Sequence, residues 1–287
     1  MRRTLPLSRD YDPRNVSMDW TRFNGNFDRL LSTDWRRVND GTSYRLSRRL
    51  LRLVIAYAQQ KRSAILDFEG KSRIFSRMAI PLNPNIVFFG AEVGWEAALI
   101  QALFGSGGKV SLIDSDPAAY QRFLNAPQTV RIRAPRGSSD RWLVARRDNP
   151  GLEYLRQDFF DVTHDAEFDV GIDWGLIEHY PDSGKRDVLN VFKKFLKPGG
   201  LHISSCPRNR LGVRLFYRAF SDELNVGYRE LMSLGELSAH LEGAGCDVED
   251  RFRLAAHNVV TWRLKRCDLE EPPPGIVPPF EPITMAV

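Results

Sequence analysis

The stretch that decides the fold is residues 84–99, PNIVFFGAEVGWEAAL. It begins with four consecutive apolar residues, Ile86–Phe89, which suit a strand buried on both faces, as in a parallel sheet. Gly90 and Gly94 bracket a turn, and apolar residues then recur at helical spacing from Trp95 onward. A strand, a tight turn and a helix N-terminus form a place where backbone N–H groups can meet a ligand. The sequence therefore predicts the cofactor loop of a doubly wound α/β enzyme.

The composition fits one large folded domain with additions, since 43% of the 287 residues are hydrophobic and 27% are charged. The formal net charge is +5, and we favour a solvated basic surface over a nucleic-acid-binding face. Cys206, Cys246 and Cys267 show neither metal-ligand nor disulfide-framework spacing, so a reducing compartment fits. The longest apolar stretch, residues 50–58, contains Arg52 and is too short to span a membrane. The N-terminus lacks a signal-peptide apolar core, so we expect a cytoplasmic protein.

A second strand follows at residues 109–113 and ends at Asp114, twenty positions after Gly94. An acidic residue at the carboxyl end of this strand is placed to accept hydrogen bonds from ribose hydroxyls. The alternative is a helix N-cap, because Asp116 and Pro117 also begin a helix. Both can hold if Asp114 and Asp116 divide the two tasks.

Further strands and helices continue the alternation. The strands predicted after the second one are residues 152–155, 168–173, 201–205, 248–254 and 259–264. The last two are separated by a short turn and should pair antiparallel as the hairpin at the sheet edge. A helix capped by Asp182 or Ser183 ends where residues 198–200, Pro-Gly-Gly, stop it. Ser233 and Glu236 form a capping box that opens another helix.

We divide the chain into three parts. Residues 1–80 form an arm and helices that pack on the core, residues 81–267 form the main domain, and residues 268–287 form a proline-rich tail. Residues 126–150 carry six arginines and read as an inserted hairpin or loop excursion. We favour a solvated insertion over a surface for an anionic substrate. Residues 206–232, rich in arginine and aromatic residues, are too long for a simple connector and predict a cover over the substrate.

Three downstream segments occur in the order found in one enzyme family. They are residues 168–170 (FDV), 173–179 (DWGLIEH) and 195–201 (FLKPGGL). With these segments, residues 84–265 resemble the class I S-adenosylmethionine-dependent methyltransferases of small-molecule type. Nicotinamide-binding domains share the glycine loop and the later acid, but no nicotinamide signature follows Asp114. The resemblance implies a mostly parallel seven-stranded sheet with helices on both faces, an antiparallel C-terminal hairpin, and S-adenosyl-L-methionine as cofactor.

The resemblance also implies the residues that bind the cofactor. They are Gly90, Ala91, Glu92, Gly94, Asp114, Ser115, Asp158, Phe159, Asp173 and Trp174. The loop residues would approach the methionine part through backbone atoms, and Asp114 would hold the ribose. Asp158 and Phe159 would meet the adenine. Asp173 and Trp174 would lie beside the sulfonium and the methionyl group, where an aromatic face attracts a cation.

The loop departs from the family pattern acid-x-Gly-x-Gly-x-Gly at two positions. Phe88 stands where the family has an acid, and Glu92 replaces the middle glycine. Phe88 removes a carboxylate that often helps to hold the loop. Glu92 either binds the methionyl ammonium or crowds the site. We predict a loop that binds the cofactor, with a degenerate loop as the alternative.

Methyl transfer from a sulfonium is an in-line displacement, so the protein mainly aligns the acceptor and excludes water. His179 is the candidate general base, because it follows the fourth strand and titrates near neutrality. Alternatively, His179 or Tyr180 caps the next helix, or His179 pairs with Glu178. The candidate substrate residues are Tyr180, Arg208, Tyr217 and His257. We predict no metal ion in the site.

The sequence thus predicts a methyltransferase that acts on O, N or C of a small molecule, which could be anionic. One alternative is an RNA or protein methyltransferase that uses the arginine-rich insertion. The other is a methyltransferase-like binding module that has lost catalysis. We expect no membrane span and no nucleic-acid partner.

Overall fold

The computed structural model describes Arg22 and residues 64–135, 140–163, 166–220, 227–254 and 256–264. In chain order the elements are α3 Ala64–Phe75, β1 Ile86–Phe89, α4 Trp95–Phe104, β2 Val110–Ile113, α5 Pro117–Asn125, β3 Thr129–Arg133, β4 Trp142–Arg146, β5 Leu152–Leu155, β6 Phe168–Trp174, the 3₁₀ helix η1 Ile177–His179, α6 Asp182–Phe195, β7 Leu196–Pro207, α7 Leu211–Ala219, α9 Leu234–Gly243, β8 Cys246–Leu254 and β9 His257–Leu264. The predicted proline-rich tail and, apart from Arg22, the arm before residue 64 lie outside these residues.

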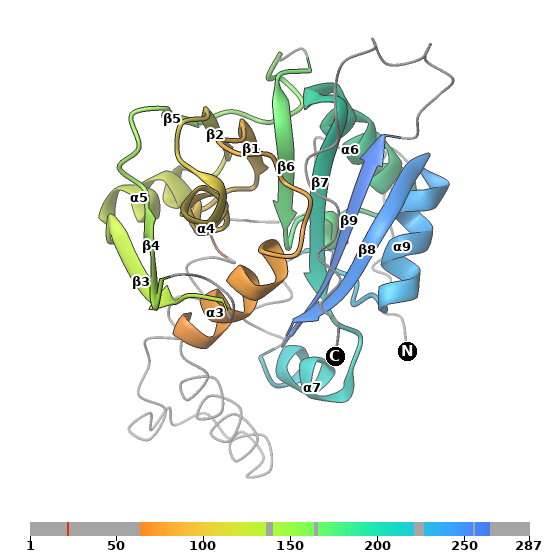
Figure 1. Ribbon diagram of the computed structural model, residues 1–287. Helices are drawn as coiled ribbons and strands as arrows, with labels where there is room; N and C mark the ends of the chain where they lie inside the picture. The colour runs from red at the N-terminus through yellow and green to blue at the C-terminus, as the bar shows by residue number, and fades with distance from the viewer. Residues whose placement is uncertain are drawn as a thin grey trace, which may run out of the picture.

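Seven strands form one sheet in the order β5-β2-β1-β6-β7-β9-β8 (Figure 1). The first five run parallel, and β9 pairs antiparallel with both β7 and β8. This confirms the mostly parallel sheet closed by an antiparallel hairpin. The second strand of the hairpin lies inside the sheet, so β8 forms the edge.

The central strands are buried on both faces, as their uninterrupted apolar sequences predict. Along β1 the side chains alternate between two hydrophobic clusters: Ile86 and Phe88 belong to one, Val87 and Phe89 to the other. Helices α3 and α4 contribute to the first cluster, and α6 and α9 to the second (Figure 1). For example, Phe192 of α6 stacks on Phe89 with ring centroids 4.2 Å apart.

Two of the three predicted helix caps are correct. Asp116 is the N-cap of α5 and accepts a hydrogen bond from Ala118 N, and Ser233 with Glu236 forms the capping box of α9. The cap predicted for α6 is wrong. Pro181 occupies the N-cap position and Asp182 is the first helical residue, with no side-chain capping bond. The position before a helix is the one that a side chain can cap, and here the proline fills it.

The predicted stop signal at residues 198–200 needs a similar correction. Helix α6 ends at Phe195, and β7 begins at Leu196, before the Pro-Gly-Gly sequence. Gly199 has a φ of 77°, and the pairing of β6 with β7 shifts register at this point. The sequence therefore makes an irregularity at the start of the strand rather than a loop that precedes it.

The arginine-rich insertion contains a hairpin, one of the two forms predicted for it. Strands β3 and β4 pair antiparallel as a separate two-stranded sheet. Ile132 and Ala145 are buried and belong to the first cluster, whereas Arg131, Arg133 and Trp142 are exposed. The alternation of buried and exposed residues follows the two-residue period of a strand.

The carboxyl ends of the parallel strands lie along one edge of the sheet. Strands β2 and β6 flank β1 on opposite sides, which makes the end of β1 a topological switch point. Helix α3 lies near the carboxyl end of β6, and α7 follows the end of β7 (Figure 1). The predicted cover, residues 206–232, starts within β7 and includes α7; residues 221–226 lie outside the described part.

Candidate functional site

The loop between β1 and α4 turns through three residues with positive φ. Gly90, Glu92 and Gly94 have φ values of 62°, 47° and 78°. The left-handed conformation of Gly94 favours glycine, and an added Cβ atom would come within 2.5 Å of Leu112 Cδ1, so that side chain would have to shift. The sharp turn brings the N-terminus of α4 directly over the end of β1.

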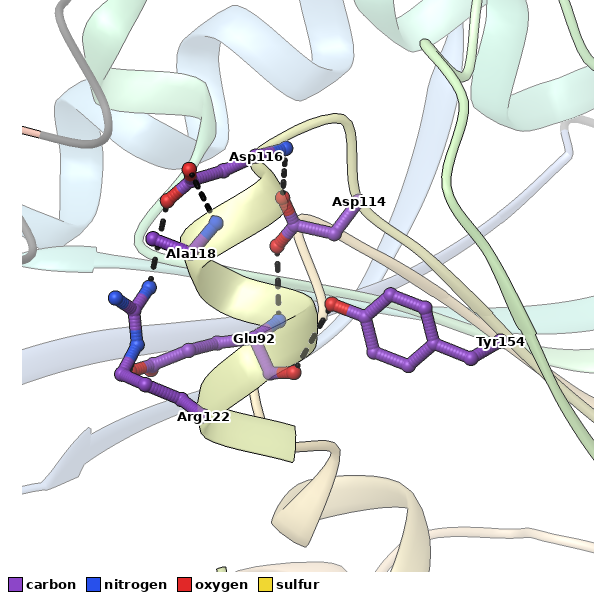
Figure 2. Close-up of polar contacts among 6 residues, drawn as sticks. All are labelled: Glu92, Asp114, Asp116, Ala118, Arg122 and Tyr154. Carbon is purple, nitrogen blue, oxygen red and sulfur yellow. Dashed lines mark hydrogen bonds and ion pairs between the residues drawn. The ribbon is translucent and has the colours of Figure 1, made fainter. Parts of the chain in front are cut away.

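Glu92 keeps the left-handed backbone that a glycine would adopt without a steric cost. Its side chain is 51% exposed, and Oε1 lies 3.1 Å from Nε of Arg122 on α5 (Figure 2). The carboxylate therefore has a structural partner on α5. The sequence did not predict this ion pair, which links Glu92, at the middle glycine position of the loop, to α5.

Asp114 fastens this loop to the end of β2 (Figure 2). Its Oδ2 accepts a hydrogen bond from Glu92 N and its Oδ1 one from Asp116 N, both at 2.9 Å. Burial raises the pKa of the Asp114 carboxyl, and the two backbone N–H bonds oppose that rise. Each carboxylate oxygen can accept a second hydrogen bond, so the half-buried group can still receive a ribose hydroxyl. Asp116 takes the capping task, as the second sequence alternative had it.

Tyr154 on β5 holds the same loop from the other side. Its hydroxyl donates to the carbonyl oxygen of Glu92 at 3.2 Å (Figure 2), and its ring packs against Tyr120 and Phe123 of α5. Burial, followed by the charge of Asp114, raises the pKa of the phenol. The sequence analysis missed Tyr154, because only the pairing of β5 with β2 brings it to the loop.

The residues predicted to meet the adenine lie after β5. Oδ1 of Asp158 accepts a hydrogen bond from Phe160 N and so closes a local turn. The Phe159 ring is buried and packs edge-on against Phe89 at 5.8 Å. Ser115, next to Asp114, is exposed.

Asp173, which was predicted to lie beside the sulfonium, has its carboxylate inside the core. It has no exposed surface, and its Oδ2 accepts hydrogen bonds from Ser204 Oγ and from Nε2 of His202. Trp262 Nε1 donates in turn to Ser204 Oγ at 3.0 Å. The side chain therefore joins β6, β7 and β9 below the carboxyl edge. Its place at a strand end was readable from the sequence, but its burial was not.

Trp174, the next residue, is half-buried at the carboxyl end of β6. Phe75 of α3 packs edge-on against its indole at 6.2 Å, and the His257 ring lies 5.8 Å away. The Lys71 ammonium of α3 lies 4.7 Å from the centroid of the same indole. The structure thus brings two of the predicted residues, Trp174 and His257, together and adds Lys71, which the sequence analysis assigned no role.

His179 is buried, with 1% of its surface exposed. Its Nδ1 donates to the carbonyl oxygen of Tyr228 at 2.9 Å, and its Nε2 lies 3.2 Å from Nη2 of Arg229. Burial, followed by the charge of Arg229, lowers the pKa of the imidazole well below its usual value. The ring therefore stays neutral and is engaged at both nitrogens. These contacts favour packing over the predicted role as general base.

Neighbours of His179 complete a buried polar cluster. Burial raises the pKa of Glu178 to about 8, and its Oε2 has no hydrogen-bond partner among the described residues. Tyr180 is 3% exposed and belongs to the second hydrophobic cluster. The Arg229 guanidinium stacks over the Tyr217 ring at 4.6 Å. Of the predicted substrate residues, Tyr180 and Tyr217 thus lie near η1 and α7.

Residues 228–232 close over this cluster. Glu230 N donates to Glu178 O at 2.9 Å, Lys185 Nζ bonds Glu230 Oε2, and Asn258 Nδ2 donates to Met232 O. Arg208 forms an isolated backbone bridge to Met232. The second half of the predicted cover is therefore anchored at η1, α6 and β9. Among the described residues, Asp182, Glu230 and His240 place one ligand atom each within 4.8 Å of one another, but Lys185 already pairs with both carboxylates.

This architecture resembles that of solved structures with low sequence identity to the chain. No protein-family model and no curated protein sequence matches the chain. Among solved structures, a possible exported protein from Bordetella parapertussis has a TM-score of 0.54 at 18% identity, over 83% of this chain and 78% of that one. The mitomycin 7-O-methyltransferase MmcR has a TM-score of 0.51 at 18% identity, over 88% and 73%. A chain of the Haloferax volcanii complex that contains the Trm112 methyltransferase activator has a TM-score of 0.51 at 14% identity, over 73% and 96%.

The chain has the class I methyltransferase fold. In this methyltransferase fold, the loop after β1, the acid after β2 and the end of β6 meet along one edge of the sheet. None of the described helices has both the length and the apolar character that a membrane crossing needs.

Proposed function

We propose that this chain is an S-adenosylmethionine-dependent methyltransferase that acts on a small molecule. The observation that carries the proposal is the loop between β1 and α4. It turns through three left-handed residues, and the half-buried Asp114 carboxylate lies directly beside it. A helix N-terminus over the strand end and a carboxylate for ribose hydroxyls are the two features that an adenosyl ligand needs at a switch point.

The residues present fit this cofactor. Asp114, with Ser115 exposed beside it, would accept from the ribose, and Asp158 and Phe159 would flank the adenine. The Glu92 carboxylate is held by Arg122, and its backbone N–H and carbonyl oxygen are held by Asp114 and Tyr154, so the other loop residues would supply the backbone contacts to the ligand. Bound there, S-adenosylmethionine would supply an activated methyl group. The protein contributes alignment of the acceptor and exclusion of water.

The acceptor would lie beyond Trp174, between α3 and the segment that contains α7. Residues 228–232 are held by η1 and α6 on this side of the edge, where they would help to exclude water. Because His179 is buried and neutral, we do not assign it the role of general base. An acceptor that ionises in solution, or one whose proton leaves to water, needs none. The two described cysteines, Cys206 and Cys246, are free and buried, as a reducing cytoplasmic setting would allow.

Isothermal titration calorimetry with S-adenosylmethionine and S-adenosylhomocysteine tests the proposal. We expect both to bind with dissociation constants in the micromolar range. If neither ligand binds at millimolar concentration, both methyltransferase functions considered for this chain are excluded. Binding without methyl transfer to any acceptor in a broad small-molecule panel would favour the binding module that has lost catalysis.

One observation favours a second candidate, an RNA methyltransferase. The outer face of the β3–β4 hairpin exposes Arg131, Arg133 and Trp142, and the Arg131 guanidinium lies 4.7 Å from the Trp142 ring centroid. Arginines beside an exposed aromatic ring can bind phosphates and stack on bases. This candidate requires affinity for RNA that falls steeply as salt rises. An RNA titration at two salt concentrations decides between the two.

A further inference from the structure

Lys71 and Glu96 form a buried ion pair at the carboxyl edge of the sheet. Lys71 Nζ lies 2.7 Å from Glu96 Oε1, and the two side chains are only 8% and 11% exposed. Lys71 comes from α3 and Glu96 from the first turn of α4, immediately after the loop. The indole of Trp174, at the end of β6, lies under the ammonium. Three elements thus meet at one pair of charges.

The pair lies where a ligand would bind rather than in the hydrophobic core. The N-terminus of α4 and the end of β6 lie on the two sides of the β1 terminus, where the strand order reverses. Ligands of doubly wound sheets bind outside the strand ends at this reversal. The helix dipole also favours an acidic side chain such as Glu96 in the first turn of α4.

A buried ion pair is a poor way to stabilise a fold, because taking both charges out of water costs about as much as their attraction returns. An apolar pair of the same volume would serve packing alone at least as well. Among the described residues, no donor other than Lys71 contacts the Glu96 carboxylate, so that carboxylate can accept more hydrogen bonds. The Glu96 carboxylate therefore has unused acceptor capacity at the place where a ligand is expected.

We infer that Lys71 and Glu96 together bind the α-amino and α-carboxylate groups at the methionyl end of the cofactor. This inference rests on the proposed function and deepens it. A zwitterion that enters between the two side chains presents its carboxylate to Lys71 and its ammonium to Glu96. One direct ion pair is then replaced by two, and no net charge is buried. Trp174 holds the Lys71 ammonium in place, so α3 supplies the anchor from outside the Rossmann-like core.

The test compares S-adenosylhomocysteine with 5′-methylthioadenosine, which has the same nucleoside and thioether but lacks the amino-acid group. We expect the unsubstituted protein to bind S-adenosylhomocysteine on the order of 100-fold more tightly, as two charge-assisted hydrogen bonds allow. Lys71→Met and Glu96→Gln should each reduce this ratio at least about tenfold, while 5′-methylthioadenosine binds as before. Calorimetry gives both affinities without reference to activity.

Lys109→Met is the matched control. Lys109 also pairs with a carboxylate, that of Glu153 at 3.1 Å, and also lies near an aromatic ring, that of Phe168, but at the amino end of β2. Its substitution should leave the ratio unchanged. The double variant Lys71→Met/Glu96→Gln buries no unpaired charge, so it gives the answer if a single variant fails to fold.

The outcomes separate the two proposals. If the unsubstituted protein binds neither nucleoside, the proposed function and this inference fall together. If it binds both and the ratio stays the same in Lys71→Met, or in the double variant, the inference alone is overturned. An increase in the ratio would overturn it as well, since Lys71 would then compete with the ligand. A loss of affinity for both ligands in equal measure would show a purely structural pair.

Discussion

Asp114 is one of two aspartates between which the sequence analysis divided ribose binding and the capping of a helix. It accepts hydrogen bonds from the backbone N–H groups of Glu92 and Asp116, and so it shapes the loop before any ligand arrives. The neighbouring Asp116 caps α5. Two aspartates two positions apart therefore serve different elements, which makes them a matched pair for mutation.

We predict that Asp114→Ala weakens binding of S-adenosylhomocysteine by at least about 1 kcal/mol, the value of one hydrogen bond to a charged group. It should also lower the free energy of unfolding by about 1–3 kcal/mol, because two backbone N–H groups lose their acceptor. Asp116→Ala should cost about 1 kcal/mol of stability through the lost cap and leave affinity unchanged. Calorimetry and urea unfolding measure both quantities. Equal affinities in the two variants would contradict the ribose assignment.

Glu178 is the residue whose titration should be visible in the stability of the protein. Burial raises its pKa from 4.5 to about 8, so the folded protein keeps the carboxyl protonated at neutral pH while the unfolded chain releases the proton. The stability associated with this group is fully present below pH 4.5. It falls as the pH rises from 4.5 to 8, by at most about 1.4 kcal/mol per pH unit.

We therefore expect the Glu178→Gln variant to become more stable relative to the unsubstituted protein as the pH rises. The difference between their free energies of unfolding should increase between pH 5 and pH 8 and level off above pH 8. Buried histidines such as His179 and His202 titrate in both proteins, so their contribution cancels in the difference. Urea unfolding at pH 5, 6.5 and 8 measures it. A difference that does not change with pH would mean that Glu178 is ionised in the folded protein.

At the scale of elements, the unit formed by β1, the loop and α4 depends on glycine at one point above all. Gly94 is the N-cap of α4 and combines a φ of 78° with a position where an added Cβ would meet Leu112 of β2. Glu92 shows that one left-handed position tolerates a side chain, because its Cβ is accommodated and its carboxylate meets Arg122. At Gly94 an added Cβ would also have to displace the Leu112 side chain.

We predict that Gly94→Ala lowers the free energy of unfolding by about 2 kcal/mol or more, through left-handed strain and overpacking against Leu112. Gly235→Ala is the control. Gly235 lies in α9, and a Cβ there meets nothing within 4 Å. Alanine should raise stability there by up to about 1 kcal/mol, since it is the better helix former. Thermal and urea unfolding compare the two. A Gly94→Ala protein as stable as the parent would show that the loop can relax.

At the scale of the whole molecule, one sheet gathers residues that are far apart in sequence. The loop after β1, the acid after β2, Tyr154 of β5, Trp174 of β6 and Lys71 of α3 all lie along its carboxyl edge. Both faces of the sheet are covered by hydrophobic clusters, so the edge is where a polar ligand can reach the strands. Occupation of this edge should therefore stabilise the entire fold.

We predict that S-adenosylhomocysteine at 100 times its dissociation constant raises the free energy of unfolding by about 2.7 kcal/mol. Asp114→Ala at the same ligand concentration should show a smaller rise, because its dissociation constant is higher. Urea titrations with and without ligand give the values. An adenine nucleotide without the thioether side chain should have a smaller effect. A ligand that binds without stabilising the fold would have to bind the unfolded chain as well.

The sequence by itself determined the local structure. The apolar run before Gly90, the proline after Asp116 and the Ser233–Glu236 capping box each act on adjacent residues, so the strands and most helix starts were predictable. It also predicted the mostly parallel seven-stranded sheet with its antiparallel hairpin, because the downstream segments resemble those of a known family. The cap of α6 was mispredicted because Pro181 occupies the N-cap position ahead of the expected residues. The end of α6 was mispredicted because the helix stops at Phe195 and β7 begins at Leu196, before the Pro-Gly-Gly sequence.

Only the tertiary structure decided which polar residues are exposed and which are buried. Asp173 lies in the same strand as Trp174, and His179 follows that strand closely. Both side chains nevertheless end in the core, because Ser204, His202 and Tyr228 approach from other segments. The Lys71–Glu96 pair spans 25 positions and two helices. Burial and ion pairing depend on the surfaces that distant segments bring together, and no pattern of neighbouring residues records those surfaces.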